Sequence, residues 1–595
     1  MNSSVIFLLN LPVCYPTTKT AGKSLSIKPG PHGIKGTSYR PPYVGGRGAV
    51  VANHPLAAEA GMRTLQKGGN TVDAMISVAF SLGVAEPSGS SIGGDGFIMV
   101  NMADKGTIEV ANGTGAAPLA ATPDNYTKGI PMTGFKSVSV PGIVDALLAV
   151  HEKYGSLTLE ICIEPAIELC EDGVPVSYFQ SENAKTFRPL IEYPTSAEVF
   201  APQGQWLKPG DKRRNQNLAK TYKKISKRGR DEFYLGDTAK AIVKFSEETG
   251  GFIKSVDLSR HSMKWQNPIS TSYRNKMIYE APPNSSGHVL LQELNILENF
   301  DLSEMDYMSP DLIHLMVEAK KLSFADREEY LADPDFVDVP LEGLISKEYS
   351  RKRSQLIFHE RSLIDPPAGD PWEFMKRLPN KAKKHKINGR LNLPGGETTH
   401  YCIVDRWGNS LSALQSIQTG YGSGMLAGNT GILMNNRMTY WHLDPNHIDY
   451  LNPGQRVRHT MNPVMVLSDP VESGGSVELV CGTPGADTQV QTNFQIISAI
   501  YDHGLNIAEA IEGPRWTHYQ GTTNSTYPHT EENFLNIENR VDKKTVDSLS
   551  NKGHLVISSG EFGAAGCAGG IQILGKDRSL FAASDLRREG YSIVW

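Results

Sequence analysis

Two adjacent threonines, Thr398 and Thr399, stand between a glycine-rich loop and two strand-like runs of this 595-residue chain. Residues 394–397 include one Pro and two Gly and do not favour a helix. Residues 400–405 are mostly apolar, as in a buried strand, and residues 410–418 read as a second strand after a short turn. The pattern predicts a β-hairpin with Thr398 at its open end.

This placement suits one kind of nucleophile. A cut between Glu397 and Thr398 would give Thr398 a free α-amine, whose reference pKa is about 7.7 to 8.0. The amine could then serve as the general base for the threonine's own hydroxyl. The alternative is an ordinary strand entrance, because threonine favours strands and Gly-Gly favours loops. Spacing alone leaves both readings open.

Several further segments on both sides of this hairpin occur in the same order as in a known family. They are G-G-N-T-V-D-A at 68–74, G-G-D-G-F at 93–97, P-P-N-S-S-G at 282–287, T-T-H-Y at 398–401, G-I-L-M-N-N-R at 431–437 and C-G-T-P-G-A-D at 481–487. The series resembles the γ-glutamyltransferase family of N-terminal-nucleophile hydrolases over roughly residues 46–590.

The resemblance implies an α+β fold, a four-layer αββα sandwich formed jointly by two autoprocessed subunits. The precursor is expected to cut itself into a large subunit, 46–397, and a small catalytic subunit, 398–595, which form a heterodimer and could pair further. Residues 1–45 are rich in Pro, Gly, Ser and Thr and are expected to be disordered.

The same resemblance implies the catalytic residues. Thr398 would be the nucleophile, Thr399 would orient the new chain end, and Ser416 would hydrogen-bond the nucleophile. The backbone N–H groups of Gly485 and Ala486 would stabilise the oxyanion, provided that Ala486 has a negative φ.

The substrate-binding positions depart from the family pattern. True γ-glutamyl enzymes hold the glutamyl α-carboxylate with an arginine and two serines, and its α-ammonium with Asn, Gln and Asp. The matching positions here are Thr114, His459, Thr460, Gln418, Arg437 and Tyr440. Since Arg437 would repel an ammonium group, we expect an acyl group that lacks the α-amine and carries a carboxylate, which Arg437 could hold bidentately.

Two short motifs, H-T-M-N-P at 459–463 and D-P-N-H at 444–447, place the chain closer to the amidase-like branch of the family, with oxamate amidohydrolase and cephalosporin acylase-like proteins. The expected reaction is hydrolysis of amides of a small oxamate-like or glutaryl-like acyl group through a threonyl ester. Two alternatives stay open: a glutathione hydrolase or γ-glutamyltransferase, and a catalytically silent binding homologue.

Composition and charge limit the kinds of partner and cofactor that we expect for this chain. The formal net charge of −5 argues against nucleic acid, and no run of 18 apolar residues predicts a membrane span. Six scattered cysteines without a C-x-x-C pair argue against a disulfide framework or zinc site, and we expect no metal or organic cofactor. Residues 5–13 are apolar but interrupted by Asn10 and Pro12, which favours a cytoplasmic protein and leaves secretion open.

Two competing motifs have weaker context. G-S-S-I-G at 89–93 fits the G-x-S-x-G pattern of serine hydrolases, but a helix-like run precedes it where a nucleophile elbow needs a strand. His400 and Cys402 could be mistaken for a thiol dyad, although residues at i and i+2 of one strand do not easily meet.

Hydrophobic periodicity predicts the remaining elements. Helices are expected at 55–67, 71–84, 310–332, 489–502 and 508–512, and strands at 48–53, 432–434, 465–467 and 476–481. The helix at 71–84 is apolar nearly all round, so we expect it to be buried.

Overall fold

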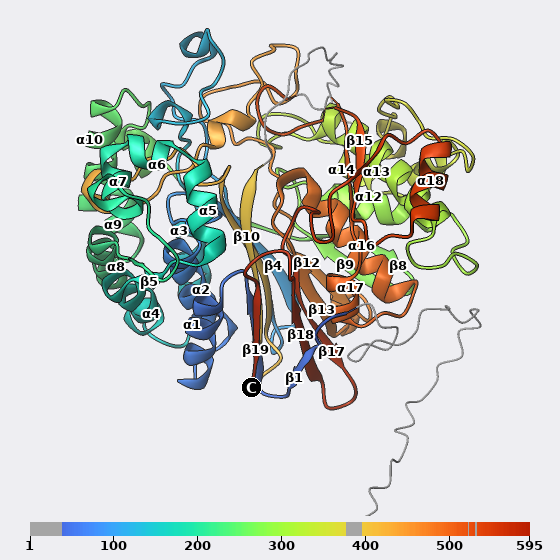
Figure 1. Ribbon diagram of the computed structural model, residues 1–595, viewed down its shortest axis with the longest axis horizontal. Coiled ribbons are helices and arrows are strands. Elements are labelled where there is room, and N and C mark those ends of the chain that lie inside the picture. The colour runs from blue at the N-terminus through green and yellow to red at the C-terminus, as the bar shows by residue number, and fades with distance from the viewer. Residues whose placement is uncertain (1–37, 377–395, 522, 530–531) are drawn as a thin grey trace, which may run out of the picture.

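Two seven-stranded sheets lie face to face at the centre of the molecule, with helices covering both outer faces (Figure 1). The computed structural model describes residues 38–376, 396–521, 523–529 and 532–595. These four layers confirm the expected αββα sandwich. Each sheet contains strands from both sides of Thr398, so the two halves of the chain share one core.

The strands follow one another across each sheet in a fixed order. The first sheet runs β19 (Tyr591–Val594), β2 (Gly48–Ala52), β10 (Glu397–Asp405), β11 (Ser410–Gln418), β3 (Asp95–Met102), β4 (Thr107–Gly113) and β7 (Lys264–Gln266). The second runs β1 (Tyr43–Gly45), β18 (Ser579–Ser584), β17 (Gly569–Leu574), β13 (Val477–Gly482), β12 (Val464–Leu467), β9 (Lys276–Glu280) and β8 (Ile269–Tyr273).

Helices form the two outer layers. The first sheet is covered by α1 (Pro55–Gln66), α2 (Thr71–Ala85), α3 (Ile143–Tyr154), α4 (Leu159–Asp172) and α8 (Gln216–Arg228). The second is covered by α12 (Gly287–Leu297), α13 (Pro310–Tyr330), α16 (Gln489–Tyr501) and α17 (Ile507–Glu512). Around these lie α5 (Tyr178–Thr186), α7 (Pro194–Phe200), α9 (Arg230–Tyr234), α10 (Asp237–Glu248), α11 (Ser255–Ser259), α15 (Lys347–Ser354), α18 (Lys543–Asn551) and a small sheet of β14 (Trp516–Tyr519), β15 (Phe534–Ile537) and β16 (Val556–Ser558).

Strand β10 shows why the hairpin sits at the centre. Its side chains alternate, with Tyr401 and Ile403 packing toward the helices and Cys402 and Val404 packing between the sheets. Strand β10 pairs antiparallel with β2 on one side and β11 on the other. Apolar contacts on both faces therefore fix this strand on each side.

The predicted buried helix is confirmed in α2. Asn70 caps it by accepting from the N–H groups of Val72 and Asp73, while Asp73 accepts from the N–H of Asn70, a complete capping box. Nearly all of its residues are buried.

Two expectations are corrected. Residues 38–45 are not disordered, because β1 pairs with β18 and the N–H groups of Tyr39 and Arg40 bind Glu512; residues 1–37 lie outside the described part. Residues 432–434 do not form a strand and make only isolated bridges from Leu433 and Met434, since the glycine-rich chain around them turns away from any sheet.

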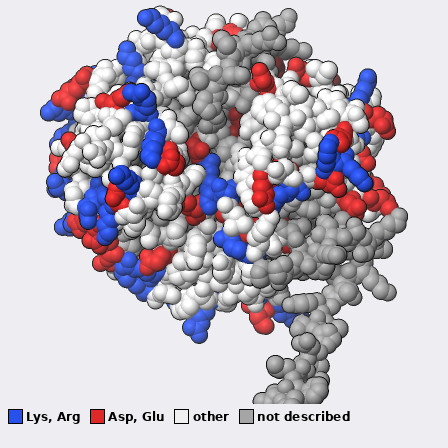
Figure 2. Space-filling model, in the orientation of Figure 1, with Lys and Arg blue, Asp and Glu red and all other residues white. Residues whose placement is uncertain are grey.

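Acidic and basic side chains are interspersed over the face shown in Figure 2. No helix in the described ranges is long and apolar enough to cross a membrane.

Candidate active site

The predicted hairpin is confirmed, and an irregularity in its pairing lies beside Thr398. Glu397 is opposite Gln418, whereas Thr399 is opposite Gln415, so β11 has one residue more than β10 at this point. Such bulges re-aim side chains next to active sites. Thr398 is buried, and its Oγ1 lies 3.3 Å from Oγ of Ser416 on the facing strand.

The hydroxyl of Ser416 has four neighbours. It donates to the carbonyl oxygen of Glu397 at 2.8 Å and accepts from Nη2 of Arg437 at 2.9 Å and from the N–H of Gln418 at 3.0 Å. A hydroxyl has one proton and two lone pairs, so these contacts satisfy it, and the contact from Thr398 is the longest of the four. The Ser416 proton therefore points at the carbonyl oxygen of the bond expected to break.

Thr399 contacts a buried acid. Its hydroxyl donates to Oε2 of Glu86 at 2.5 Å. Burial raises the pKa of Glu86 to about 8, and the bond from Thr399 opposes part of that shift. At neutral pH this carboxyl is therefore mostly protonated, and it contacts the residue that follows Thr398.

The predicted oxyanion turn lies against the segment that precedes Thr398. A Cβ added to Gly396 would lie 3.1 Å from Cβ of Ala486 and 3.3 Å from the hydroxyl oxygen of Tyr440. Gly485 has φ of 127° and Ala486 has φ of 50°, not the negative value expected for Ala486. A non-glycine residue in this region carries strain of about 1 to 2 kcal/mol.

Contacts of Asp487 hold this strained turn in place. Its carboxylate accepts from the N–H (2.8 Å) and the hydroxyl (2.7 Å) of Ser525 and pairs with Arg327. These contacts fix the residue directly after Ala486.

Four of the predicted substrate-binding residues lie together. The guanidinium carbon of Arg437 lies 4.6 Å from the ring centre of Tyr440, the Tyr440 hydroxyl is 3.3 Å from that of Thr460, and the ring of His459 lies 6.1 Å from that of Tyr440. All four are buried.

The other two predicted residues bind different partners. Gln418 donates to Thr526 at 2.9 Å, and Thr114 donates to Asn112 at 2.7 Å.

Asp95, which the sequence analysis did not single out, neutralises Arg437. Its Oδ2 is 3.3 Å from Nε of Arg437 and 3.7 Å from Nε2 of His459, while Oδ1 accepts from the N–H of Gly115. Burial and the charge of Arg437 lower the pKa of His459 to about 4, so this ring is neutral at pH 7. This buried cluster thus holds one arginine charge and one compensating carboxylate.

Arg437 has fewer free donor nitrogens than the predicted bidentate contact with a substrate carboxylate would use. Its Nε and Nη2 already donate to Asp95 and Ser416, and Nη1 is the nitrogen with no hydrogen-bond partner among the described residues. The two N–H groups at Nη1 are thus the buried donors of Arg437 that no described residue accepts from.

A cavity of about 370 Å³ lies on the other side of the 396–397 segment. It is lined by Lys320, Phe324, Gly396, Glu397, Gly485, Ala486, Asp487, Thr488, Gln491, His518, Tyr519, Gln520, Thr523, Asn524, Phe534, Ala565 and Arg588. Both carboxylate oxygens of Glu397 are bound by Arg588, with Nη2 3.0 Å from Oε1. The predicted oxyanion turn and the predicted cleavage site therefore line the same cavity.

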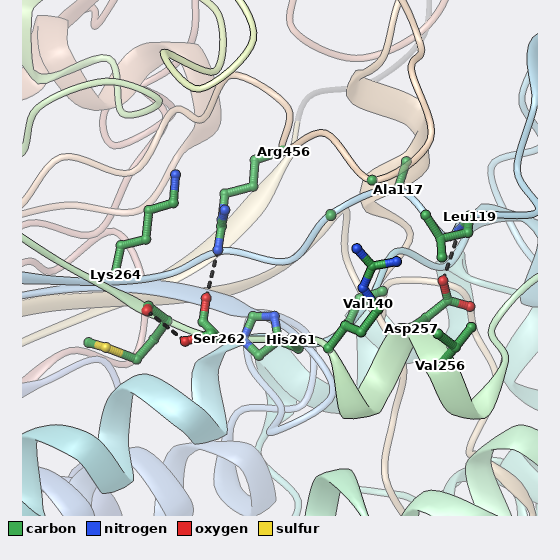
Figure 3. Close-up of a pocket in the computed structure, with 13 residues that line it drawn as sticks. Ala117, Leu119, Val140, Val256, Asp257, His261, Ser262, Lys264 and Arg456 are labelled. Carbon is green, nitrogen blue, oxygen red and sulfur yellow. Dashed lines mark hydrogen bonds between the residues drawn. The ribbon is translucent and has the colours of Figure 1, made fainter.

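A second cavity of the same volume lies elsewhere, beside Arg456 and His261 (Figure 3). There Arg456 donates to the carbonyl oxygen of Ser262 at 2.7 Å, and Leu119 donates to Asp257. Thr398 is not among the residues that line it.

Among the described residues, three clusters have side chains close enough to share a metal ion, and none of them includes Thr398, Ser416 or Arg437. They are Asp73, His151 and Cys162; His314, Glu318 and His554; and Glu328, His442 and His447. In the third, the rings of His442 and His447 stack in parallel with centres 3.3 Å apart. Parallel rings direct their lone pairs side by side, which does not suit a shared ion.

Neither the G-x-S-x-G motif nor the His400–Cys402 pair has the structural surroundings that its catalytic role would need. Residues 89–93 follow helix α2 and precede strand β3, the reverse of a nucleophile elbow. Burial lowers the pKa of His400 to about 3 and raises that of Cys402, so a neutral imidazole and a protonated thiol result. Both are core residues.

Comparison with known proteins decides the family. A family model described as gamma-glutamyltranspeptidase matches residues 57–595. The chain belongs to the gamma-glutamyltranspeptidase family. Within it, the chain is 34% identical over 555 residues to the "Glutathione hydrolase-like YwrD proenzyme" of Bacillus subtilis (strain 168), covering 92% of this chain and 99% of that protein.

Acylases are also among the relatives. The "Acylase ACY 1 proenzyme" of Pseudomonas sp. (strain V22) is 32% identical over 94% of this chain and 95% of its own. The crystal structure of cephalosporin acylase from Bacillus halodurans superposes with a TM-score of 0.83 at 30% identity, covering 94% of this chain and 97% of that one. The protein is thus an enzyme of the N-terminal-nucleophile hydrolase type, from a family of proenzymes.

Proposed function

We propose that this chain is the precursor of an amidohydrolase that cleaves amides of a small, carboxylate-bearing acyl group. The observation that carries the proposal is the buried Asp95–Arg437 pair beside Tyr440 and His459. An α-ammonium group there would need a carboxylate, and the one in contact, Asp95, already balances Arg437. An acyl group with an acceptor atom can instead receive an N–H at Nη1 of Arg437.

Self-cleavage comes first. The hydroxyl of Thr398 attacks the carbonyl carbon of Glu397, and the negative charge develops on the oxygen that Ser416 contacts. The proton of the hydroxyl passes to the nitrogen of Thr398 as the C–N bond breaks, so that Glu397 becomes an ester on the Thr398 oxygen and Thr398 gains its α-amine. Water then hydrolyses this ester, which frees the carboxylate of Glu397 and restores the hydroxyl. The fragments 1–397 and 398–595 stay together as a heterodimer, because each sheet takes strands from both.

Substrate turnover repeats this chemistry. The α-amine takes the proton of the Thr398 hydroxyl as its oxygen attacks the amide carbon, and the proton then passes to the departing amine. Water hydrolyses the threonyl ester and frees the acid. The N–H groups at Gly485 and Ala486 are the proposed oxyanion donors.

The test uses cleaved enzyme on oxamate, glutaryl-p-nitroanilide, γ-glutamyl-p-nitroanilide and glutathione, with Thr398→Ala as the control. Faster release of ammonia or nitroaniline from the first two supports the proposal. Preference for the γ-glutamyl compounds overturns it in favour of a glutathione hydrolase, a name several relatives carry. Absence of turnover on all four would indicate a binding protein.

A further inference from the structure

Glu397 is held at two points, its backbone carbonyl oxygen and its side-chain carboxylate. Its carbonyl oxygen accepts from Ser416 at 2.8 Å, and its side-chain carboxylate is held by both terminal nitrogens of Arg588. Three carbon atoms, Cα, Cβ and Cγ, separate the carbonyl carbon from the carboxylate carbon in a glutamate residue. A glutaryl amide has the same three carbons between its amide carbonyl and its carboxylate.

Glu397 also occupies the acyl position of the first reaction at Thr398. In the ester formed during self-cleavage, the acyl group on the Thr398 oxygen is the Glu397 residue itself. Resting on the proposed function above, we propose that Arg588 is the specificity residue of the mature enzyme, which binds the distal carboxylate of a glutaryl-length acyl group where the precursor holds its own Glu397.

Cleavage changes the electrostatics of the cavity. Arg588 keeps its positive charge at any physiological pH, and its side chain is 18% exposed, so it is neither fully buried nor free in solvent. When Glu397 becomes a chain end and leaves, the guanidinium faces the cavity shared with Gly485 and Ala486. A bidentate carboxylate then restores the geometry that Glu397 provided.

The other charged groups nearby have partners or are neutral. Asp487 pairs with Arg327, Lys320 donates to Gln520 at 3.2 Å, and Glu589 accepts from Gln180 at 3.0 Å. Burial keeps Glu86 mostly protonated, as its pKa of about 8 indicates. Arg588 is thus the charge that cleavage releases.

The experiment measures kcat/KM of cleaved enzyme on succinyl-, glutaryl-, adipyl- and valeryl-p-nitroanilide. Valeryl has the length of glutaryl without its charge. We expect glutaryl to exceed succinyl and adipyl about fivefold, because a bidentate contact depends on distance. Arg588→Met should lower the glutaryl value about five- to tenfold and leave the valeryl value nearly unchanged, because the guanidinium–carboxylate contact is partly exposed to solvent.

Arg588→Lys keeps the positive charge but loses the paired N–H groups of the guanidinium. Its kcat/KM on the glutaryl substrate should therefore lie between those of the wild type and of Arg588→Met. The matched control is Arg406→Met, an exposed arginine in the hairpin turn, which should leave all four values unchanged. If Arg588→Met yields too little cleaved protein, inhibition of the wild-type enzyme by free glutarate, succinate and adipate gives the same answer, with glutarate expected to bind most tightly.

Equal loss on glutaryl and valeryl substrates, or no preference for the five-carbon length, overturns the assignment of Arg588. If oxamate is turned over while Arg588→Met changes nothing, the proposed function stands and the role of Arg588 falls. Turnover of γ-glutamyl compounds alone would defeat the proposed function itself.

Discussion

Arg437 contacts Ser416, which faces Thr398, and Arg588 contacts Glu397, which precedes it, but the two arginines differ in how permanent their partners are. Arg437 is bound by Asp95 and Ser416, both of which remain after cleavage. Arg588 is bound by Glu397, which the proposed cut before Thr398 would turn into a chain end. A charge with a permanent partner can position catalytic groups, whereas a charge with a departing partner can recognise a ligand.

The comparison requires that the chain be cut at Thr398. Thr398→Ala removes the attacking oxygen, so we expect one uncut chain on denaturing gels and no amide turnover. Wild-type protein should instead resolve into two fragments with a new N-terminus at Thr398. Two fragments from the alanine variant would show that another group cuts the chain.

Removal of the permanent partner should have the next largest effect. Asp95→Asn leaves the buried Arg437 without its counter-charge, and breaking such a pair costs about 3 to 5 kcal/mol. The free energy of unfolding should be measured by urea titration in the Thr398→Ala background, where self-cleavage does not interfere. The exposed Asp104→Asn is the control. Equal midpoints for the two variants would mean that Asp95 does not balance Arg437.

Ser416→Ala tests what Arg437 positions. Loss of one donor to a developing oxyanion typically lowers a rate about 100- to 1,000-fold, and self-cleavage should slow accordingly. The measurement is a time course of fragment appearance after synthesis. Ser416→Thr keeps the hydroxyl and should cleave close to the wild-type rate; a Thr variant as slow as Ala would assign Ser416 a packing role.

Part of this site was predictable from the sequence and part was not. The hairpin, the buried helix α2 and the position of Thr398 follow from local patterns, because alternation, capping and glycine turns act over a few residues. The αββα sandwich came from the family resemblance. Local signals also failed at residues 432–434, where an apolar run forms only isolated bridges, and at residues 38–45, where composition predicted disorder and a strand forms.

The charge pairs could not be predicted in the same way. Asp95 and Arg437 lie 342 positions apart, Glu86 and Thr399 are separated by 313, and Glu397 and Arg588 by 191. No periodicity connects residues at such separations, and each pair exists only because the sheets bring distant strands together. The positive φ of Ala486 is likewise imposed by its surroundings and not by its side chain.

A smaller effect is expected from the buried acid beside Thr399. Burial raises the pKa of Glu86 to about 8 in the folded chain, whereas the unfolded chain loses this proton near pH 4.5. The contribution of Glu86 to stability should therefore be fully present below pH 4.5 and fall as pH rises toward 8, by up to about 1.4 kcal/mol per pH unit.

Glu86→Gln removes this proton exchange and should flatten that part of the profile. Urea midpoints of both proteins in the Thr398→Ala background, from pH 5 to 8, give the slopes. Parallel profiles for the two proteins would mean that Glu86 is ionised in the folded chain.

The two arginines should differ in how strongly each is coupled to its carboxylate in the precursor. The Arg588–Glu397 pair is partly exposed, with side chains 18% and 26% accessible, so solvent weakens it. A double-mutant cycle of Arg588→Met and Glu397→Gln in the Thr398→Ala background should give a coupling energy of about 1 kcal/mol, well below that of the fully buried Asp95–Arg437 pair. A weak pair suits a contact that must be given up when the chain is cut, because the free energy lost with Glu397 is then small. A coupling as large as that of Asp95 with Arg437 would make Glu397 a structural anchor and remove the distinction between the two arginines.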